Sequence, residues 1–203
     1  MALVLGLTGK CCVGKDVAAE YLEKHSWKVI HVDQTGHRAL QEERAALEAA
    51  FGSRVIEPDG RVNRKALGDI VFSDSRKLKS LEAILHPRMR EIVEQSTRDY
   101  REQGQNVCIN AALLFPMDLH RNCDYVIVIK AALYLRIKWA IQREGWSYLQ
   151  ILQRFWSQRR LFPKKKTKNV DMYNVWNSES REVLHQKVEQ TVEEILTINE
   201  RQG

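Results

Sequence analysis

The feature that most constrains this chain is a short loop near the amino terminus that contains two glycines and a lysine. Residues 9–15 read G-x-x-x-x-G-K, between an apolar run, Ala2–Leu7, and a helical pattern from Lys15 to about His25. Such an apolar run is typical of a strand buried on both faces. A strand, a glycine loop and a helix in this order favour phosphate binding, because successive backbone N–H groups and the helix N-terminus surround an anion. The alternative is a chance match in an ordinary turn.

The loop pattern predicts a binding site for the phosphates of a nucleotide. Lys15 is expected to reach the β- and γ-phosphates. The residues of this loop that we expect to contact the nucleotide form one continuous stretch: Gly9, Lys10, Cys11, Cys12, Val13, Gly14, Lys15, Asp16 and Val17.

The eighth position of the pattern departs from the usual residue types. Phosphate-binding loops place a Ser or Thr hydroxyl there to hold Mg²⁺, whereas this chain has Asp16. A carboxylate also binds Mg²⁺, so Asp16 is the candidate metal ligand, although it would repel phosphate oxygens at close range. Lys10 would offset part of this repulsion. The alternative is that Asp16 is an ordinary first-turn acid that favours the helix dipole.

Strands and helices alternate along the rest of the chain, which predicts an α/β fold with a parallel sheet. Further strands are expected over 27–32, 107–114, 125–129 and, more weakly, 172–176. Helices are expected over 34–51, 63–72, 74–103, 133–143, 147–160 and 179–201. Asn63 and Asp74 are expected to cap the helices that they precede, and Pro87 is expected to kink or split the longest one.

Positive charge is concentrated in one segment. The net charge is +6, and residues 136–168 hold ten Lys or Arg residues against a single acid, Glu144. A concentrated charge predicts an anionic partner, either nucleic acid or a small phosphate-rich ligand. Nucleic acid is the less favoured of the two, because the chain contains no recognised nucleic-acid-binding motif.

Composition and cysteine usage exclude several classes of protein. With 44% hydrophobic residues the chain can bury a core. No apolar run approaches the roughly 20 residues that a membrane-spanning helix needs, and Ala2–Leu7 lacks the basic flank of a signal peptide. The four cysteines, at 11, 12, 108 and 123, form no C-x-x-C pair, so we expect a reduced, cytoplasmic chain.

Several blocks of residues resemble the dephospho-coenzyme A kinase family, and together they cover nearly the whole chain. The resemblance begins with Gly6–Gly9, which leads into Gly14-Lys15, and continues with Val29–Asp33 at the end of the second expected strand. The most specific part is the block Asp59–Leu67 followed by Leu85-His86-Pro87. Further similarities lie at Ile70–Phe72, Ala112–Leu114, Gln142-Arg143, Arg154, Gln158, Asp171 and Asn177.

The resemblance implies a fold and an activity. The implied fold is a single three-layer P-loop kinase domain, with a parallel sheet core over about 1–55, 105–135 and 169–203. A helical substrate-binding region near 60–104 and a basic helical lid near 136–168 complete it. The implied activity is the phosphorylation of the ribose 3′-hydroxyl of dephospho-coenzyme A by ATP with Mg²⁺, the final step of coenzyme A biosynthesis. A homo-oligomer is left open.

The resemblance also implies catalytic roles. Asp33 resembles the catalytic carboxylate, which would align the acceptor hydroxyl and accept its proton; the alternative is a helix cap. Lys15 and Arg143 are the expected cations on the transferred phosphoryl group, with Arg143 reaching it from the lid. The alternative for Arg143 is a solvated helix face. Asn177 is expected near the adenine, with capping of the last helix as an equal alternative.

Substrate-binding residues are expected at Asp33, Arg64, His86 and Leu113. Arg64 could instead be an exposed helix residue, and His86 could simply mark a structural break before the following proline. His31 is expected to face the same side of its strand as Asp33, because side chains alternate with a period of two. It either orients the substrate or is a polar residue packed at that place.

Six residues depart from the family's pattern close to the expected chemistry. They are Lys10, Cys11, Asp16, His31, Ala112 and Pro116. We therefore keep two alternatives beside the kinase: a homologue that binds nucleotide or coenzyme A without turnover, and a P-loop kinase of a nucleoside or nucleotide.

Overall fold

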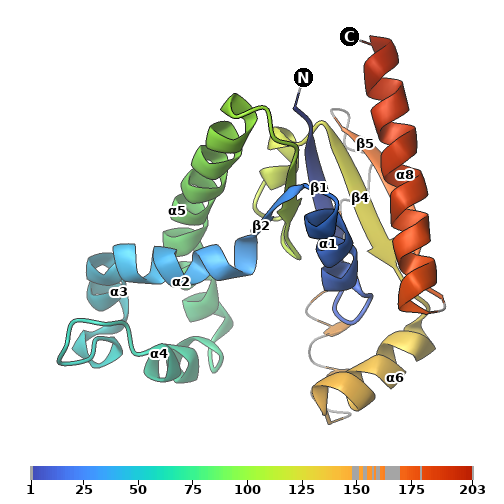
Figure 1. Ribbon diagram of the computed structural model, residues 1–203. Helices are drawn as coiled ribbons and strands as arrows, with labels where there is room; N and C mark the ends of the chain where they lie inside the picture. Colours follow the sequence, from blue (N-terminus) through green and yellow to red (C-terminus); the bar gives the residue numbers. More distant parts are fainter. Residues whose placement is uncertain are drawn as a thin grey trace. The chain divides into compact units, whose positions relative to one another are not determined.

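The computed structural model describes residues 2–147, 151–152, 155–156, 158, 161–162, 170–178 and 180–202 of the 203-residue chain, without the side chains of residues 143, 144 and 202 (Figure 1). The chain divides into two compact units. The first contains residues 1–30 and 97–203, and the second contains residues 31–96. The division of the chain implied by the family resemblance, with a substrate-binding region near 60–104, stays a prediction.

The first unit is built around one sheet, in which the described strands lie in the order β2-β3-β1-β4-β5. β1 pairs in parallel with β3 and with β4, and β4 pairs in parallel with β5. The strands are β1 (Val4–Gly9), β2 (Lys28–His31), β3 (Val107–Asn110), β4 (Tyr125–Lys130) and β5 (Asp171–Trp176). Each residue of β1 is buried, which explains its continuous apolar sequence.

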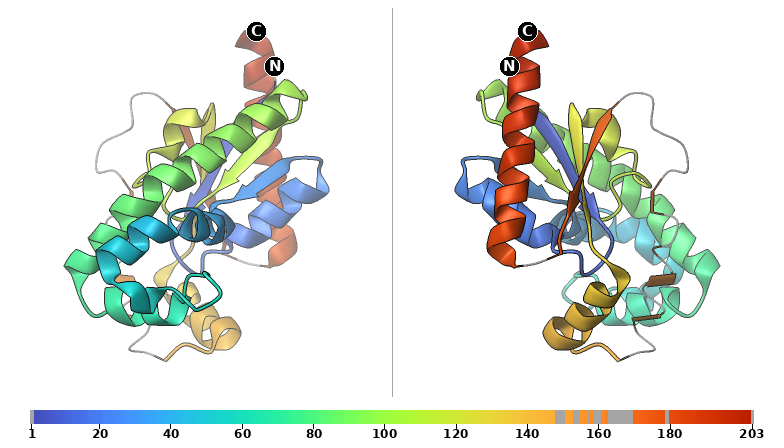
Figure 2. Two further views of the ribbon diagram at one scale, coloured as in Figure 1. Left: turned by 90° about the vertical axis from the view of Figure 1, so that its left-hand side faces the viewer. Right: turned by 90° about the vertical axis from the view of Figure 1, so that its right-hand side faces the viewer.

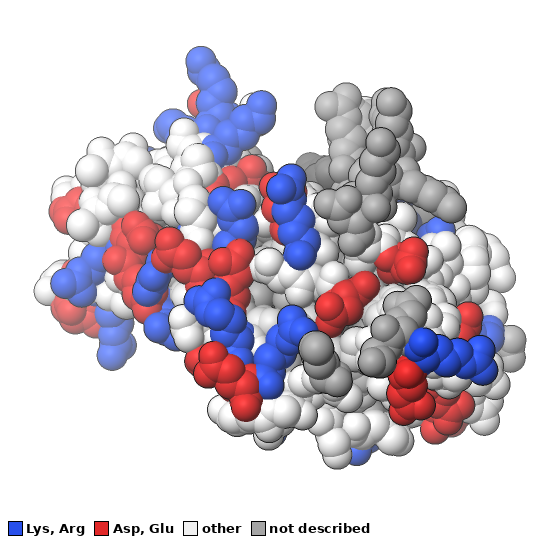
Figure 3. Space-filling view, turned by 90° about the horizontal axis from the view of Figure 1, so that it is seen from above, with Lys and Arg blue, Asp and Glu red and all other residues white. Residues whose placement is uncertain are grey.

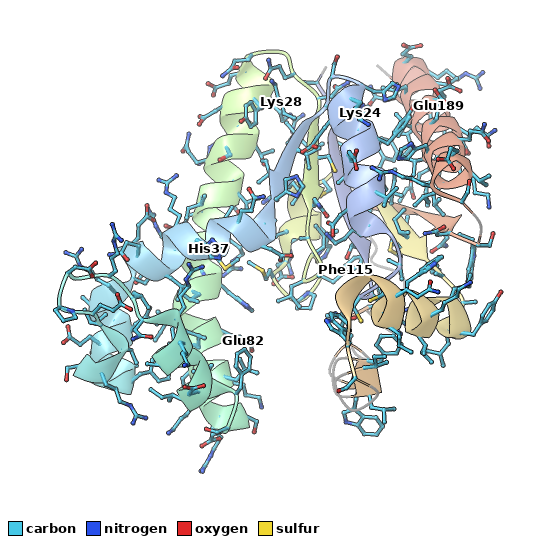
Figure 4. The ribbon with its side chains drawn as sticks, turned by 60° about the horizontal axis from the view of Figure 1, so that its bottom comes forward. Lys24, Lys28, His37, Glu82, Phe115 and Glu189 are labelled. Carbon is cyan, nitrogen blue, oxygen red and sulfur yellow. The ribbon has the colours of Figure 1, made fainter. Side chains whose placement is uncertain are left out.

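Helices α1 (Lys15–Lys24) and α8 (Arg181–Gln202) cover one face of this sheet (Figure 2). They lie side by side, with Lys24 on α1 and Glu189 on α8 labelled in Figure 4. Leu5 and Leu7 of β1, Leu22 of α1 and Leu184 of α8 belong to one buried cluster. Alternate residues of β1 therefore form the core between the sheet and its helices.

The segment after β3, which contains the short helix η2 (Leu119–Asn122), lies on the other face (Figure 2). At Gly6 an added Cβ would lie 2.8 Å from Leu114 Cδ2 and 3.0 Å from Cys123 Sγ. The absence of a side chain at Gly6 therefore lets this segment pack directly against β1. Helix α6 (Leu133–Glu144) follows β4 in the same unit.

The second unit is helical. Its elements are α2 (Val32–Glu42), α3 (Arg44–Phe51), η1 (Ser53–Val55), α4 (Arg64–Val71) and most of α5 (Ser75–Glu102). Leu47, Val55, Leu67 and Ile92 lie in its own buried cluster. The unit therefore has a separate core, as expected for an inserted compact region.

Two predicted caps of this unit are confirmed. Asn63 Oδ1 accepts a hydrogen bond from the backbone N–H of Ala66 at 2.9 Å, at the start of α4. Asp74 Oδ1 accepts from the N–H of Arg76 at 2.8 Å, at the start of α5. Both contacts satisfy N–H groups that have no partner inside the helix.

The sequence-based bounds of two elements are wrong. The helix expected over 34–51 begins at Val32 and is divided at Glu43, and the strand expected over 107–114 ends at Asn110. The long helix α5 is not split by Pro87. Leu85 and Ile92, which flank the proline, are buried in the core of the second unit, and this packing compensates for the lost backbone hydrogen bond.

Candidate active site

The expected phosphate loop joins the carboxyl end of β1 to the first turn of α1, so the predicted strand–loop–helix context is confirmed. β1 lies between β3 and β4, and the carboxyl ends of these strands share one edge of the sheet. In open α/β sheets, ligands bind at this edge where the strand order reverses. The loop therefore lies where the architecture favours a ligand.

Both glycines of the loop pattern are required by the space around them. At Gly9 an added Cβ would lie 2.7 Å from Val13 Cγ2 and 2.8 Å from the carbonyl oxygen of Ile129. Gly14 has φ 89°, and its added Cβ would lie 2.6 Å from Asn177 Nδ2. The loop conformation is therefore built into the packing, because a side chain at either position would displace a neighbour.

Asn177 braces the loop from the end of β5. Its backbone N–H donates to the carbonyl of Lys130 at 2.7 Å, and its buried side-chain Nδ2 donates to the carbonyl of Val13 at 2.9 Å. The alternative that Asn177 caps the last helix is wrong, because α8 begins at Arg181 and Ser180 Oγ accepts from the N–H of Val183. The expected contact of Asn177 with an adenine stays a prediction.

Lys15 and Asp16 form a polar cluster with Asn110, which ends β3. Lys15 Nζ lies 2.8 Å from Asp16 Oδ1 and also donates to Asn110 Oδ1. Asn110 Nδ2 donates to Asp16 Oδ1 at 3.2 Å. The Lys15 side chain is 11% exposed and that of Asp16 is 81% exposed, so the cation is largely enclosed while the carboxylate faces solvent.

Sequence reasoning did not identify Asn110 as a site residue. It is 2% exposed, and it is the polar residue that ends an otherwise apolar strand, Val107–Asn110. A polar residue at the carboxyl end of a buried strand is the signal that could have identified it, since such residues face the ligand edge of the sheet.

A second contact network holds the backbone at Cys11. Arg136 of α6 is 7% exposed, and its Nε donates to the carbonyl of Cys11 at 3.0 Å. Its guanidinium carbon lies 4.1 Å from the centre of the Phe155 ring, which favours a cation–π contact. The N–H of Cys11 donates to Gln158 Oε1 at 2.6 Å. Arg136 was expected only as one cation of a basic segment, whereas the structure places it against the loop.

Most of the other cations of the 136–168 segment cannot be assigned a contact. The side chain of Arg143 and all of Arg154 lie outside the described residues, as do residues 159–160, 164–166 and 168. Figure 3 shows one face of the molecule, on which basic and acidic side chains of the described residues adjoin one another. The role of Arg143 stays a prediction.

The strand geometry expected for His31 and Asp33 is wrong. β2 ends at His31, which is the N-cap residue of α2, and Asp33 lies exposed in the first turn of that helix. The two side chains therefore do not alternate along a strand. A helix start favours an acid in its first turn, because the backbone dipole is positive there.

Arg64 and His86, the other expected residues of the second unit, lie on α4 and α5. Arg64 Nη1 donates to Nε2 of His37, on α2, at 2.9 Å. Sequence reasoning missed His37, which is labelled in Figure 4. His86 is partly buried, and burial lowers its pKa; Arg90 acts in the same direction and Glu82 opposes it. Leu113 lies partly buried in the first unit, after β3. The roles of these residues in substrate binding stay predictions.

Comparison with known proteins gives consistent matches over nearly the whole chain. The family model for dephospho-CoA kinase matches residues 3–182. The dephospho-CoA kinase of Borrelia garinii subsp. bavariensis is 29% identical over 202 residues, covering 96% of this chain and 95% of that protein. The enzyme of the same name from Staphylococcus aureus is 31% identical over 197 residues, covering 96% and 94%.

A solved structure supports the same assignment. The dephospho-CoA kinase from Campylobacter jejuni superposes with a TM-score of 0.73 at 25% identity, covering 98% of this chain and 100% of that one. The α/β fold class and the family expected from the sequence are both confirmed. The chain therefore belongs to the dephospho-CoA kinase family.

Proposed function

We propose that this chain transfers the terminal phosphoryl group of ATP to the ribose 3′-hydroxyl of dephospho-coenzyme A, giving ADP and coenzyme A. Family membership over residues 3–182 supports this activity. The observation that carries it is the glycine loop at the carboxyl end of β1, with the enclosed Lys15 at its helix start. The comparisons do not favour a binder without turnover or a kinase of another substrate class.

The loop supplies the donors for the phosphates. Its backbone N–H groups and the N-terminus of α1 attract negative charge, and Lys15 adds a cation. The N–H of Cys11 donates to the neutral amide oxygen of Gln158. A phosphate oxygen that takes this donor would form a charge-assisted hydrogen bond, which is the stronger kind.

We propose Mg²⁺ as the metal, with Asp16 as its protein ligand. Mg²⁺ prefers oxygen donors, and the Asp16 carboxylate is 81% exposed although it contacts Lys15 and Asn110. Among the described residues, His, Cys, Asp and Glu form no group of three that could hold a metal. The remaining ligands would thus be phosphates and waters, as is usual for Mg²⁺, which when bound neutralises charge on the β- and γ-phosphates.

We propose roles for the residues that would bind and activate the acceptor. Asp33 would accept the proton of the 3′-hydroxyl. In the same step, the hydroxyl oxygen bonds to the γ-phosphorus while the bond between the γ-phosphorus and the ADP oxygen breaks. Arg143 would stabilise the charge that develops on the transferred phosphoryl oxygens. Arg64, His86 and Leu113 are proposed to contact dephospho-coenzyme A.

We propose a cytoplasmic location. All four cysteines lie in the described part of the chain and are free thiols. Burial raises the pKa of Cys108 to about 12, which keeps this thiol protonated and unreactive. None of the helices that the structure describes combines the length and hydropathy required to cross a bilayer. The free thiols fit a reducing compartment.

Purified protein with ATP, Mg²⁺ and dephospho-coenzyme A tests the proposal. We expect ADP and coenzyme A to form in equal amounts, measured by chromatography. A parallel panel of nucleosides and nucleotides as acceptors separates the proposed reaction from that of another P-loop kinase. Thermal stabilisation by ATP or dephospho-coenzyme A without product would support a binder without turnover and would refute the proposed activity.

A further inference from the structure

The loop cluster differs from the general P-loop arrangement at its metal-binding position. P-loop proteins hold Mg²⁺ with a neutral Ser or Thr hydroxyl on the loop and with an aspartate elsewhere in the site. Here the loop residue is the acid, Asp16, and the neutral residue is Asn110, at the end of β3. β3 is directly paired with β1, and the two side chains are in contact at 3.2 Å.

We propose that the carboxylate and the neutral group of the metal-binding pair have exchanged positions in this chain. In this assignment Asp16 carries the charge toward the metal, and Asn110 is a positioning residue that orients Asp16 and Lys15. The inference rests on the proposed function, because it concerns the metal that accompanies the nucleotide.

The hydrogen bonds of Asn110 show why the neutral residue is an amide. Its Oδ1 accepts from the Lys15 ammonium, and its Nδ2 donates to the Asp16 carboxylate. An amide presents one acceptor and one donor group, so one side chain satisfies a cation and an anion at once. The side chain is 2% exposed, which holds it in this orientation.

An aspartate at position 110 would be incompatible with Asp16. It has no donor when ionised, and it would place a second carboxylate about 3.2 Å from the first, the present contact distance. Like charges at such a distance cannot both remain ionised at modest cost. Asp16 and Asn110 therefore depend on each other: the acid on the loop requires a neutral donor on β3.

A four-protein cycle tests this dependence: wild type, D16S, N110D and D16S/N110D. The readout is the dissociation constant of ADP, measured by calorimetry with Mg²⁺ and again with EDTA, so that no turnover is needed. We expect each single variant to lose about 10-fold or more of the Mg²⁺-dependent gain in affinity, the range typical of groups that orient metal ligands. The double variant restores a hydroxyl on the loop and an acid on β3, and it should recover most of the gain.

Two further proteins keep the cycle interpretable. N110A removes the amide without adding a charge, and adding D16S should not restore the affinity that N110A loses. N110A takes the place of N110D in the cycle if N110D does not fold. E182S removes the first-turn acid of another helix, α8, in the same unit. If Asp16 serves only the helix dipole, D16S and E182S should change the melting temperature alike and leave the Mg²⁺ dependence unaltered, which would overturn the proposal.

The outcomes separate the two levels of inference. Wild-type protein that binds ADP, with losses in the two single variants that simply add in the double variant, refutes the exchange and leaves the proposed kinase intact. Wild-type protein that binds no adenine nucleotide, with or without Mg²⁺, refutes both. Recovery in D16S/N110D, without recovery in D16S/N110A, supports the exchange.

Discussion

The phosphate loop and the second unit hold their expected functional residues in different ways. Around the loop the contacts come from buried groups on other elements, namely Asn110, Arg136 and Asn177. In the second unit, Arg64 contacts His37 at the surface, and Arg88 forms an exposed ion pair with Glu42. Packing therefore determines the geometry of the loop, whereas solvent and salt weaken the polar contacts of the second unit.

This difference explains how the loop can depart from its family pattern and still be well formed. Its two glycines and its braces are set by space and by buried hydrogen bonds, so the residues between them can vary. In the second unit, the local contacts of Arg64 and His86 alone do not show what these residues bind. The following variants test this comparison, starting with the largest expected effect.

Asp33→Asn is expected to have the largest effect. Removing a general base typically costs about 10²–10⁴-fold in rate, and nucleotide affinity should not change if Asp33 acts only on the acceptor. Steady-state kinetics together with ADP calorimetry measure both quantities. Asp69→Asn, an exposed acid on α4 of the same unit, is the control. Full activity in the Asp33 variant would remove its assigned role.

Lys15→Ala should abolish most of the activity through the loop. Losing one preorganised cation at the phosphates should lower kcat by roughly 10²–10³-fold, and ADP should bind more weakly. The matched control is Lys24→Ala at the other end of α1, where the lysine is exposed and pairs with Glu20. If both variants keep wild-type kinetics, the loop does not hold the transferred phosphate.

Gly14→Ala tests whether space determines the loop. The φ of 89° and the 2.6 Å approach to Asn177 predict a loss of about 1–3 kcal/mol in stability together with weaker ADP binding. Gly104→Ala is the comparison, because Gly104 has φ 73° but no atom within 4 Å of an added Cβ. Equal shifts in melting temperature for the two variants would show that only the backbone conformation matters.

Arg136→Lys should weaken the brace at Cys11 while keeping the charge. A lysine cannot both stack on the Phe155 ring and donate in the same plane, so we expect a stability loss of about 1–3 kcal/mol. Chemical denaturation measures it. Lys138→Ala, on the exposed side of α6, should have little effect. A wild-type denaturation midpoint in Arg136→Lys would show that a positive charge at this position is sufficient for the stability.

His86→Gln should have the smallest effect, which is a change in the pH dependence of stability. Burial lowers the pKa of His86 in the folded unit below its ordinary 6.5, so the unfolded chain takes up the proton first as the pH falls. The contribution of neutral His86 to the stability is therefore full above pH 6.5. It is lost as the pH falls through the lowered pKa that His86 has in the folded unit.

Melting curves across this acidic range measure the effect. His86→Gln should flatten the loss of stability. Glu82→Gln removes the carboxylate that opposes the pKa shift and should steepen it (Figure 4). Identical acid profiles for wild type and both variants would contradict the burial of His86.

The sequence predicted those parts of the site that are local in the chain. The loop with Lys15 follows from adjacent residues, and so do the caps at Asn63 and Asp74. Asn110 and Arg136 are part of the loop's surroundings only because β3 pairs with β1 and α6 follows β4. Such contacts depend on strand order, which local patterns do not determine.

Two departures from local sequence patterns have a similar cause. Val32 continues an apolar, strand-like run in sequence, but it is the buried first residue of α2. Pro87 normally interrupts a helix, yet the packing of its neighbours keeps α5 continuous. In both places tertiary burial outweighed local propensity.

The hydrogen bond from Arg136 to the backbone of Cys11 has a consequence for the affinity of the loop for a triphosphate. The carbonyl of Cys11 is already held by Arg136, a contact that a phosphate oxygen on the Cys11 N–H would not break. A loop that is already ordered loses little conformational entropy when its ligand binds, so less of the interaction free energy is offset by the cost of ordering the loop. A loop that becomes rigid during folding in this way binds the triphosphate more tightly.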